Sequence, residues 1–369
     1  MLPAAWPVFA DAATFASAGI AQAIPGTAGI HEWSYLATVG KSPFDKIGLH
    51  RLDKGSAPPA HPAAVVLYLP GTNMNGEIAL DDPRYSFQVY LATRGIDVWS
   101  MDYRTHFIPP STPESDLSEL TGWTNDLFIS DIDTAAKFIG AQTGQAKIFI
   151  AGFSRGGEFA YMFAAMHPER VAGLVILDGY IPVVALESEP LPPGKYAVDI
   201  GGKHLTYEKR KALMQMVIDN PNQPAPIPKY KTAGENLEHV LYDADGFFGG
   251  HGGLANPQGG HSNVSVLARL LIGYDRYWPA IQDHEYPFTL ARLAALKATK
   301  VPVIAFASTN MGRIWTEGGE AAAHVTGAPA AEVSFTKFDG WGHLDVLAGT
   351  DSEKRVFAPT AKFIMRQRR

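Results

Sequence analysis

A serine stands between two glycines at residues 152–156, which read Gly-Phe-Ser-Arg-Gly. The apolar stretch 147–151 predicts a short buried strand before it, and apolar side chains at helical spacing over 155–167 predict a helix after it. A serine on so sharp a turn needs small neighbours, because side chains at 152 and 156 would collide with the adjacent backbone. The turn would expose the hydroxyl of Ser154 and aim the following amides at the oxygen that it attacks. The pattern therefore predicts a nucleophile, with a plain glycine turn as the alternative.

Other chemistries find less support in the residue types. The chain has no cysteine, which excludes disulfides, zinc-thiolate sites and a thiol nucleophile. His251 and His261 lie in or beside a glycine-rich stretch, but no carboxylate or thiol pattern accompanies them, so we expect no metal site. We interpret the stretch 246–260 as a mobile lid, and we expect no cofactor.

Alternating strands and helices must position these residues. The predicted strands cover residues 33–39, 47–52, 63–69, 96–101, 147–151, 171–177, 301–307 and 333–338. The predicted helices cover residues 85–94, 126–139, 155–167, 317–324 and 353–365. The first two strands are expected to form an antiparallel pair. The alternation implies an α/β fold with a mostly parallel, eight-stranded sheet and helices on both faces.

The alternation stops between residues 181 and 299, here called the inserted segment. Proline-rich turns separate helical pieces such as 207–218 and 264–277. An insertion of that size between two core strands has to lie over the strand ends, so we expect a mainly helical cap. The predicted domains are a core in two parts, 1–180 and 300–369, and the cap between them. Several aromatic residues of this segment suit an apolar substrate or the cap's own core: Phe247, Phe248, Tyr274, Tyr277, Trp278, Tyr286 and Phe288.

Composition narrows the class of protein. The 369 residues are 46% hydrophobic and 18% charged, which is enough for a large core. The net charge is −6 and the 31 basic residues are scattered, so we expect no nucleic-acid partner. No apolar run reaches about 18 residues, which argues against a membrane span. The stretch 1–23 has no basic region and contains Asp11, so we read no signal peptide and expect a soluble protein, cytoplasmic rather than secreted.

With these features in place, the chain resembles the α/β-hydrolases. The resemblance covers about 250 residues, 1–180 and 300–369, and leaves the inserted segment out. It rests on the turn at Ser154, on Pro70-Gly71 after a buried strand, and on Gly342-His343 near the C-terminus. In this family the general base follows the last strand, which implies His343 for that role. A surface-loop histidine is the alternative.

The resemblance also implies an acid that orients the histidine. Its usual place follows strand 301–307, but residues 308–311 read Ser-Thr-Asn-Met and contain no carboxylate. Asp178 ends the preceding strand, where some lipases of this superfamily keep their acid, and the order Ser154, Asp178, His343 agrees with the superfamily. Glu317, an arrangement assisted by Asn310, and a purely structural Asp178 remain alternatives. Asp339 and Asp345 lie too close to His343 in sequence to be favoured.

Two amides should stabilise the oxyanion of a tetrahedral intermediate. The resemblance implies the amide of Arg155, which begins a helix, and one from Thr72 or Asn73, although an ordinary turn is the alternative for the latter pair. His106, Phe153 and Trp341 are further candidates to line the substrate site. We expect Arg104 to form a structural ion pair with Asp102 or with a neighbour.

The resulting hypothesis is a serine hydrolase of carboxylic esters that works through an acyl-enzyme, with a capped apolar pocket for a small-molecule ester. The alternative substrates for the same triad are an amide or peptide, a lactone or a carbon–carbon bond, since pocket shape decides the substrate. Serine at position 154 argues against dehalogenase or epoxide hydrolase chemistry, where this turn carries aspartate. A non-catalytic binding protein of the same fold is a third possibility. The sequence predicts no particular oligomeric state.

Overall fold

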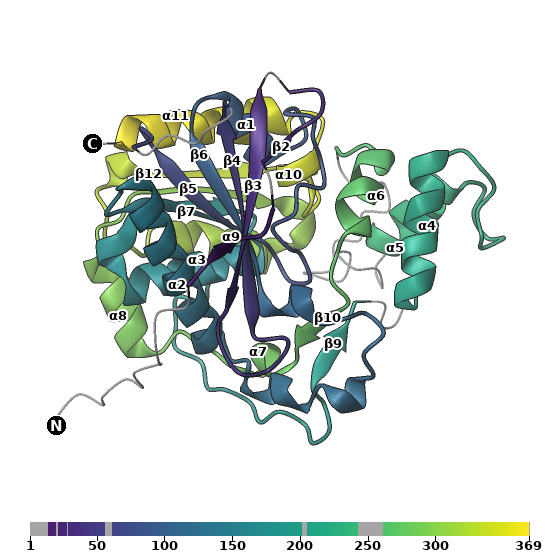
Figure 1. Ribbon diagram of the computed structural model, residues 1–369, viewed down its shortest axis with the longest axis horizontal. Coiled ribbons are helices and arrows are strands. Elements are labelled where there is room, and N and C mark those ends of the chain that lie inside the picture. The colour runs from purple at the N-terminus through teal and green to yellow at the C-terminus, as the bar shows by residue number, and fades with distance from the viewer. Residues whose placement is uncertain are drawn as a thin grey trace.

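The computed structural model describes residues 14–19, 21–27, 29–55, 61–200, 205–242 and 261–368. Ten strands form one sheet in the order β1-β3-β4-β6-β5-β7-β8-β11-β12, with β2 paired to β3. The sheet fans out through the centre of the molecule with helices on both sides (Figure 1). The stretch 246–260, which we interpreted as a lid and which includes His251, Phe247 and Phe248, lies outside the described residues.

The sheet strands are β1 (Ala16–Ser17), β2 (Gln22–Ala23), β3 (Ile30–Thr38), β4 (Lys46–Lys54), β5 (Val65–Leu69), β6 (Asp97–Asp102), β7 (Ile148–Phe153), β8 (Val171–Leu177), β11 (Val303–Ser308) and β12 (Val333–Phe338). The helices of the core are α1 (Phe87–Thr93), α2 (Asn125–Thr143), α3 (Arg155–Met166), α9 (Arg313–Ala323), α10 (Asp345–Ala348) and α11 (Ala358–Gln367). The inserted segment holds β9 (Ala197–Asp199), β10 (Tyr277–Pro279), α4 (Tyr207–Asp219), α5 (Ala233–Tyr242), α6 (Val264–Ile272), α7 (Ile281–His284) and α8 (Leu290–Ala298).

The strand directions confirm the predicted sheet. From β6 through β5, β7, β8 and β11 to β12 every neighbouring pair is parallel. β3 and β4 are antiparallel to each other, and β4 is antiparallel to β6. The eight strands of five or more residues are the predicted ones, and the sheet reaches ten through the two-residue strands β1 and β2. Such short strands show no alternation that a sequence pattern can detect.

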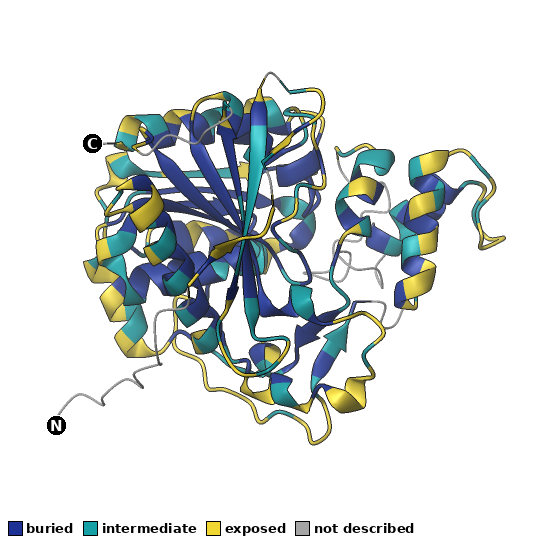
Figure 2. Cartoon of the chain, in the orientation of Figure 1, coloured by how far each residue is buried: buried dark blue, intermediate teal, exposed yellow. Residues whose placement is uncertain are grey.

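The parallel strands are buried on both faces. All five residues of β5 are buried, and they alternate between two hydrophobic clusters: Val66 and Tyr68 face one, while the others face the second. The first cluster includes residues of α1 and α11, and the second includes residues of α2, α3 and α8. The central strands are therefore buried along their length (Figure 2). Such double coverage explains why these strands are continuous apolar runs.

The inserted segment divides between two places. Helices α4, α5 and α6 pack against one another and group to one side of the sheet (Figure 1). The strands β9 and β10 pair antiparallel, and α8 packs against α3, so the end of the segment lies with the core helices. The helix expected over 264–277 ends at Ile272, and Tyr277 already belongs to β10.

Buried ion pairs join the strands to their neighbours. The Arg51 side chain donates from Nε to Asp97 Oδ1 at 3.0 Å, which links β4 to β6. The Arg104 side chain pairs with Asp131 of α2, at 2.6 Å from Nε to Oδ2, and with Asp45. Arg104 thus forms the expected structural ion pair with neighbours, and Asp102 is not its partner.

Asp102 instead belongs to a chain of charges across three strands. His50 on β4 contacts Glu32 Oε1 on β3 at 2.6 Å and Asp102 Oδ2 on β6 at 2.9 Å, one carboxylate for each ring nitrogen. Although burial lowers the pKa of His50, its hydrogen bonds to Asp102 and Glu32 raise the pKa from 6.5 to about 10. The imidazole is therefore protonated at neutral pH and cross-links the antiparallel part of the sheet.

The cross-link made by His50 predicts that the free energy of unfolding depends on pH. Because the pKa of His50 is higher in the folded than in the unfolded chain, its contribution is complete below about pH 6.5 and is lost as the pH rises through about 10. We expect His50→Gln to lower the free energy of unfolding by about 3–5 kcal/mol at pH 6.5. The difference in thermal midpoint between wild type and variant should narrow steadily toward pH 10, whereas exposed His61→Gln should match wild type throughout. A difference in thermal midpoint that stays constant from pH 6.5 to 10 would contradict the role of protonated His50 as a cross-link.

Candidate functional site

The side chains predicted for chemistry gather at one edge of the sheet. Ser154 follows β7, Asp178 follows β8, His343 follows β12, and Thr72 with Asn73 follows β5. These strands are parallel neighbours or near neighbours, so their carboxyl ends meet at the same edge. Residues far apart in sequence therefore share one site, in the position where open α/β sheets commonly bind ligands.

Ser154 lies on a turn that only small neighbours permit. Its φ is 54° and its ψ is −120°, a conformation that costs a non-glycine residue free energy. A Cβ atom added to Gly156 would lie 2.0 Å from the carbonyl oxygen of Leu69, and one added to Gly152 would lie 2.1 Å from that of Gly156. The steric argument made from the sequence holds at both glycines.

His343 and Asp178 are joined by a buried hydrogen bond. The distance from His343 Nδ1 to Asp178 Oδ2 is 2.7 Å, and the two residues are 3% and 0% exposed. Asp178 Oδ1 accepts from the backbone amide of Ser308 at 2.7 Å and from Trp315 Nε1 at 3.2 Å. Both carboxylate oxygens are thus engaged. A proton held on Nδ1 leaves Nε2 as the basic nitrogen of the neutral ring.

Aromatic rings and a second carboxylate fix the position of the imidazole. The His343 ring lies 4.6 Å from the Phe153 ring and 5.3 Å from that of Trp315, measured between centroids. Asp345 Oδ2 accepts from the amides of Gly342 at 2.7 Å and His261 at 2.8 Å. Burial raises the pKa of Asp345, and these amide hydrogen bonds oppose the rise. Asp345 therefore shapes the loop that carries the histidine.

Ser154 and His343 line the same cavity, whose volume is about 590 Å³. Thr72, Asn73 and Phe153 also line it, as do residues of the inserted segment such as Leu186 and Ile200. A serine hydroxyl, an imidazole and apolar side chains thus face one cavity. That combination suits a small organic molecule with one reacting polar group.

Charged side chains of the cavity wall are paired. Arg155 donates to Glu158 at 2.8 Å and to Asp283 of α7 at 2.6 Å. Glu285 Oε2 accepts from the amide of Asn125 at 2.9 Å, and Asp199 Oδ2 accepts from Arg276 Nε at 2.8 Å. Each of these charged side chains in the cavity wall therefore has a polar partner.

Two stretches of backbone lie next to the serine. Arg155 is the first residue of α3, so its amide has no acceptor within the helix. The turn after β5 comes equally near, because a Cβ atom on Gly71 would lie 3.1 Å from Ser154 Cβ. Asn73 in that turn has a φ of 62° and lies against the inserted segment. The turn therefore presents Thr72 and Asn73 to the cavity.

Several sequence candidates lie elsewhere. His106 does not line this cavity, because its ring is turned toward Asp275, with 2.9 Å from Nδ1 to Oδ1. Trp341 does not line it either, since its side chain is fully buried against Phe338, with 4.3 Å between the ring centroids. Both substrate-lining expectations are therefore wrong.

The two residues considered as alternatives to Asp178 make other contacts. Glu317 is 64% exposed in its side chain and lies 3.5 Å from Arg313 on the same helix. Asn310 donates through Nδ2 to the carbonyl oxygen of Gly340 at 3.1 Å. The carboxylate that contacts His343 is that of Asp178.

Sequence reasoning missed Trp315 and Asp283. Trp315 contacts both Asp178 and His343, and Asp283 pairs with the residue after the serine. Asp178 lies 137 positions from Trp315, and Asp283 lies 128 positions from Arg155, so no local pattern connects these pairs. The sequence shows a tryptophan soon after a core strand, but its position in the sequence does not indicate which residues it contacts.

Metal and membrane sites receive no support from the part of the chain that the structure describes. Within those residues, no group of three or more His, Asp or Glu side chains is arranged to hold a metal ion. No helix among them is both long enough and apolar enough to cross a bilayer. His261 contacts Asp345 through its backbone amide and packs its ring against Trp341.

Known proteins resemble this chain in sequence and in structure. Residues 64–201 match the sequence model of a family described as alpha/beta hydrolase fold. The crystal structure of a "putative lipase" from Sulfolobus solfataricus is 26% identical, covers 96% of this chain and 99% of that one, and superposes with a TM-score of 0.76. The subunit PhaC of poly(3-hydroxyalkanoate) polymerase from Allochromatium vinosum is 28% identical over 134 residues. That match covers 36% of this chain and only about a third, 35%, of the relative.

The contacts of the glycines at the serine turn predict that a larger side chain is not tolerated there. In Gly156→Ala the new methyl group would meet the backbone oxygens of Leu69 and Pro70, at 2.0 and 2.6 Å, and backbone cannot move aside easily. We expect the free energy of unfolding to fall by about 1–3 kcal/mol or more. Gly122→Ala is the matched control, because nothing lies within 4 Å of its Cβ position. Denaturant unfolding of both variants measures the effect, and equal stability would refute the steric account.

Proposed function

Because the chain belongs to the α/β-hydrolase superfamily, we propose that it is a serine hydrolase that cleaves carboxylic esters through an acyl-enzyme intermediate. The observation that carries the proposal is the buried hydrogen bond between His343 and Asp178 beside a cavity that Ser154 also lines. A base that is oriented by a carboxylate and shares a pocket with a serine is the arrangement that activates a hydroxyl.

In the proposed reaction each group has a defined task. Ser154 Oγ attacks the ester carbonyl carbon while His343 Nε2 takes the hydroxyl proton. The carbonyl oxygen becomes an oxyanion, which the amides of Arg155 and of Thr72 or Asn73 stabilise. The intermediate collapses, the C–O bond to the alcohol breaks, and His343 returns the proton to the departing oxygen. Water then attacks the acyl-serine by the same route and releases the acid.

Asp178 has two tasks in this scheme. Its contact with Nδ1 keeps the proton on that nitrogen, so Nε2 is basic when the serine needs it. When the ring becomes an imidazolium, the carboxylate stabilises the positive charge. The contacts from Ser308 and Trp315 hold the carboxylate in place during both states.

The substrate proposal rests on the walls of the cavity. Leu186, Ile200 and Tyr286 come from the inserted segment, and Met311 and Trp315 from the core. We assign the inserted segment the role of a cap that covers an apolar acyl or alcohol portion. The likeness to the Sulfolobus protein, whose description reads lipase, supports a small ester with an apolar part.

Removing the serine hydroxyl tests the proposed reaction. We expect Ser154→Ala to lower kcat on p-nitrophenyl butyrate by about 10⁶-fold, because the nucleophile is lost. Wild type should react covalently with a fluorophosphonate probe at Ser154, and the variant should not. A circular dichroism spectrum and thermal midpoint like those of wild type are the controls for folding. Undiminished hydrolysis by Ser154→Ala would refute the nucleophile, and an unlabelled, inactive wild type would favour a binding protein.

The identity of the acid has its own test. Asp178→Asn should lower kcat by about 10⁴-fold, because an amide favours the wrong tautomer of His343. Glu317→Gln should leave kcat near the wild-type value, since that exposed side chain contacts Arg313. Steady-state kinetics of both variants on the same ester compare the two carboxylates. Loss of activity in the Glu317 variant alone would assign the acid to Glu317.

A further inference from the structure

The turn that would supply the second oxyanion amide is held by contacts with the inserted segment. Asn73 has a φ of 62°, a left-handed conformation that asparagine adopts more readily than most other non-glycine residues. Its carbonyl oxygen accepts from the amide of Asp275 at 2.7 Å. Its side-chain Nδ2 donates to the carbonyl oxygens of Asp275 at 3.1 Å and Arg276 at 3.3 Å. Residues 275–276 of the inserted segment therefore hold Asn73 in place through three hydrogen bonds.

The Asp275 side chain adds a second connection to the same turn. Asn75 Nδ2 donates to Asp275 Oδ1 at 3.1 Å and to the carbonyl oxygen of Gly273 at 2.9 Å. Backbone and side chain of Asp275 thus both contact the stretch 73–75. Any displacement of this residue would move Asn73 with it.

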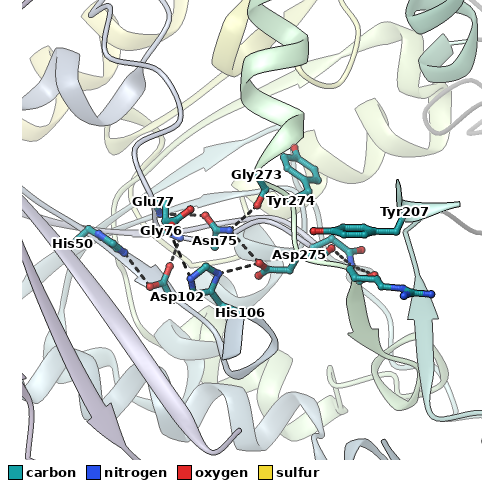
Figure 3. Close-up of polar contacts among 12 residues, drawn as sticks. His50, Asn75, Gly76, Glu77, Asp102, His106, Tyr207, Gly273, Tyr274 and Asp275 are labelled. Atoms are coloured by element: carbon teal, nitrogen blue, oxygen red, sulfur yellow. Dashed lines mark hydrogen bonds and ion pairs between the residues drawn. The ribbon is translucent and has the colours of Figure 1, made fainter. Parts of the chain in front are cut away.

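His106 provides the charge that keeps the Asp275 carboxylate buried. His106 Nδ1 lies 2.9 Å from Asp275 Oδ1, and the aspartate side chain is only 9% exposed. Figure 3 shows the His106 ring between Asp102 on one side and Asp275 on the other. Glu77 Oε1 lies 3.9 Å from the second ring nitrogen. The turn is held at its far end as well, because the amide of Gly76 donates to Asp102 Oδ1 at 2.7 Å.

The charges around His106 favour its protonated form. Burial lowers the pKa of His106, but the hydrogen bond to Asp275 and the negative charges of Asp102, Asp275 and Glu77 raise it to about 9. Burial in turn raises the pKa of Asp275, and the protonated His106 opposes that rise. His50 contacts Asp102 Oδ2 at 2.9 Å and is a further cation of this network. At neutral pH the contact is therefore an ion pair.

We propose that His106 and Asp275 are positioning residues, whose ion pair holds the Thr72–Asn73 amides where the oxyanion of ester hydrolysis forms. The inference rests on the function proposed above. Without its cation, the buried carboxylate of Asp275 would be uncompensated and would move toward water. Asn73 would then relax, and the amide donors would leave the oxyanion. A shift of about 1 Å in such a group can lower turnover by about 10²-fold while substrate still binds.

The test compares two histidines that differ in their contacts. His106→Phe keeps a planar ring but removes both donors, and His167→Phe is the matched control. The two histidine side chains are 24% and 25% exposed, and each faces carboxylates, but His167 faces Asp133 and Glu169. For p-nitrophenyl butyrate we expect kcat of His106→Phe to fall by about 10²-fold with KM changed less than about threefold. His167→Phe should keep the wild-type kcat and KM.

A transition-state analogue separates positioning from loss of stability. A trifluoromethyl ketone forms a tetrahedral adduct with the serine, so its oxygen needs the same amide donors. Its inhibition constant should rise in His106→Phe by about the same factor as kcat falls. In the double variant His106→Phe/Asp275→Asn the uncompensated charge is gone, and we expect part of the lost kcat to return.

The outcomes distinguish this inference from the proposed function. If wild type hydrolyses the ester but His106→Phe keeps its kcat and its affinity for the ketone, the positioning role is overturned and the hydrolase proposal stands. If wild type is neither active nor labelled by the fluorophosphonate, both are overturned. Should His106→Phe fail to fold, Asp275→Asn decides: a lower kcat at unchanged KM supports the inference, and a wild-type kcat overturns it.

Discussion

The hydrogen bond between His343 and Asp178 joins two segments that lie 165 positions apart in the sequence. It forms where strands β8 and β12 end, and its burial means that any loosening would leave a carboxylate unpaired away from water. The surrounding groups follow from that constraint. Ser308 and Trp315 occupy the other carboxylate oxygen, Phe153 and Trp315 enclose the ring, and Asp345 shapes the loop that delivers it.

A second set of buried charges lies next to the turn after β5 and supports the site. His50 connects three strands, and Asp102 connects that cluster to the amide of Gly76. His106 and Asp275 continue the set into the inserted segment. Carboxylates and imidazoles alternate along this path, so each buried charge has an opposite neighbour (Figure 3). The sheet, the turn after β5 and the inserted segment are thereby held in one arrangement.

The sequence predicts those features that depend on neighbours along the chain. The glycines around Ser154 could be read because their collisions involve the turn itself and the strand beside it. Asp178 could be favoured because it ends the strand at which some lipases of the α/β-hydrolase superfamily keep their acid. The roles of His106 and Trp315 could not be read, since their partners lie 169 and 137 positions away and ring orientation decides the contact. Trp341 was misjudged for the same reason: its position in the loop did not reveal that the side chain turns inward.

The contact between Arg155 and Asp283 links the residue after Ser154 to helix α7 of the inserted segment. Asp283 is 48% exposed in its side chain, so dissolved ions reach one half of the pair, while the Arg155 side chain is only 17% exposed. The salt concentration of the solution would thus affect how the inserted segment packs against the core next to Ser154. Salt would weaken the Arg155–Asp283 ion pair at concentrations well below those that affect the buried charges beneath the sheet edge.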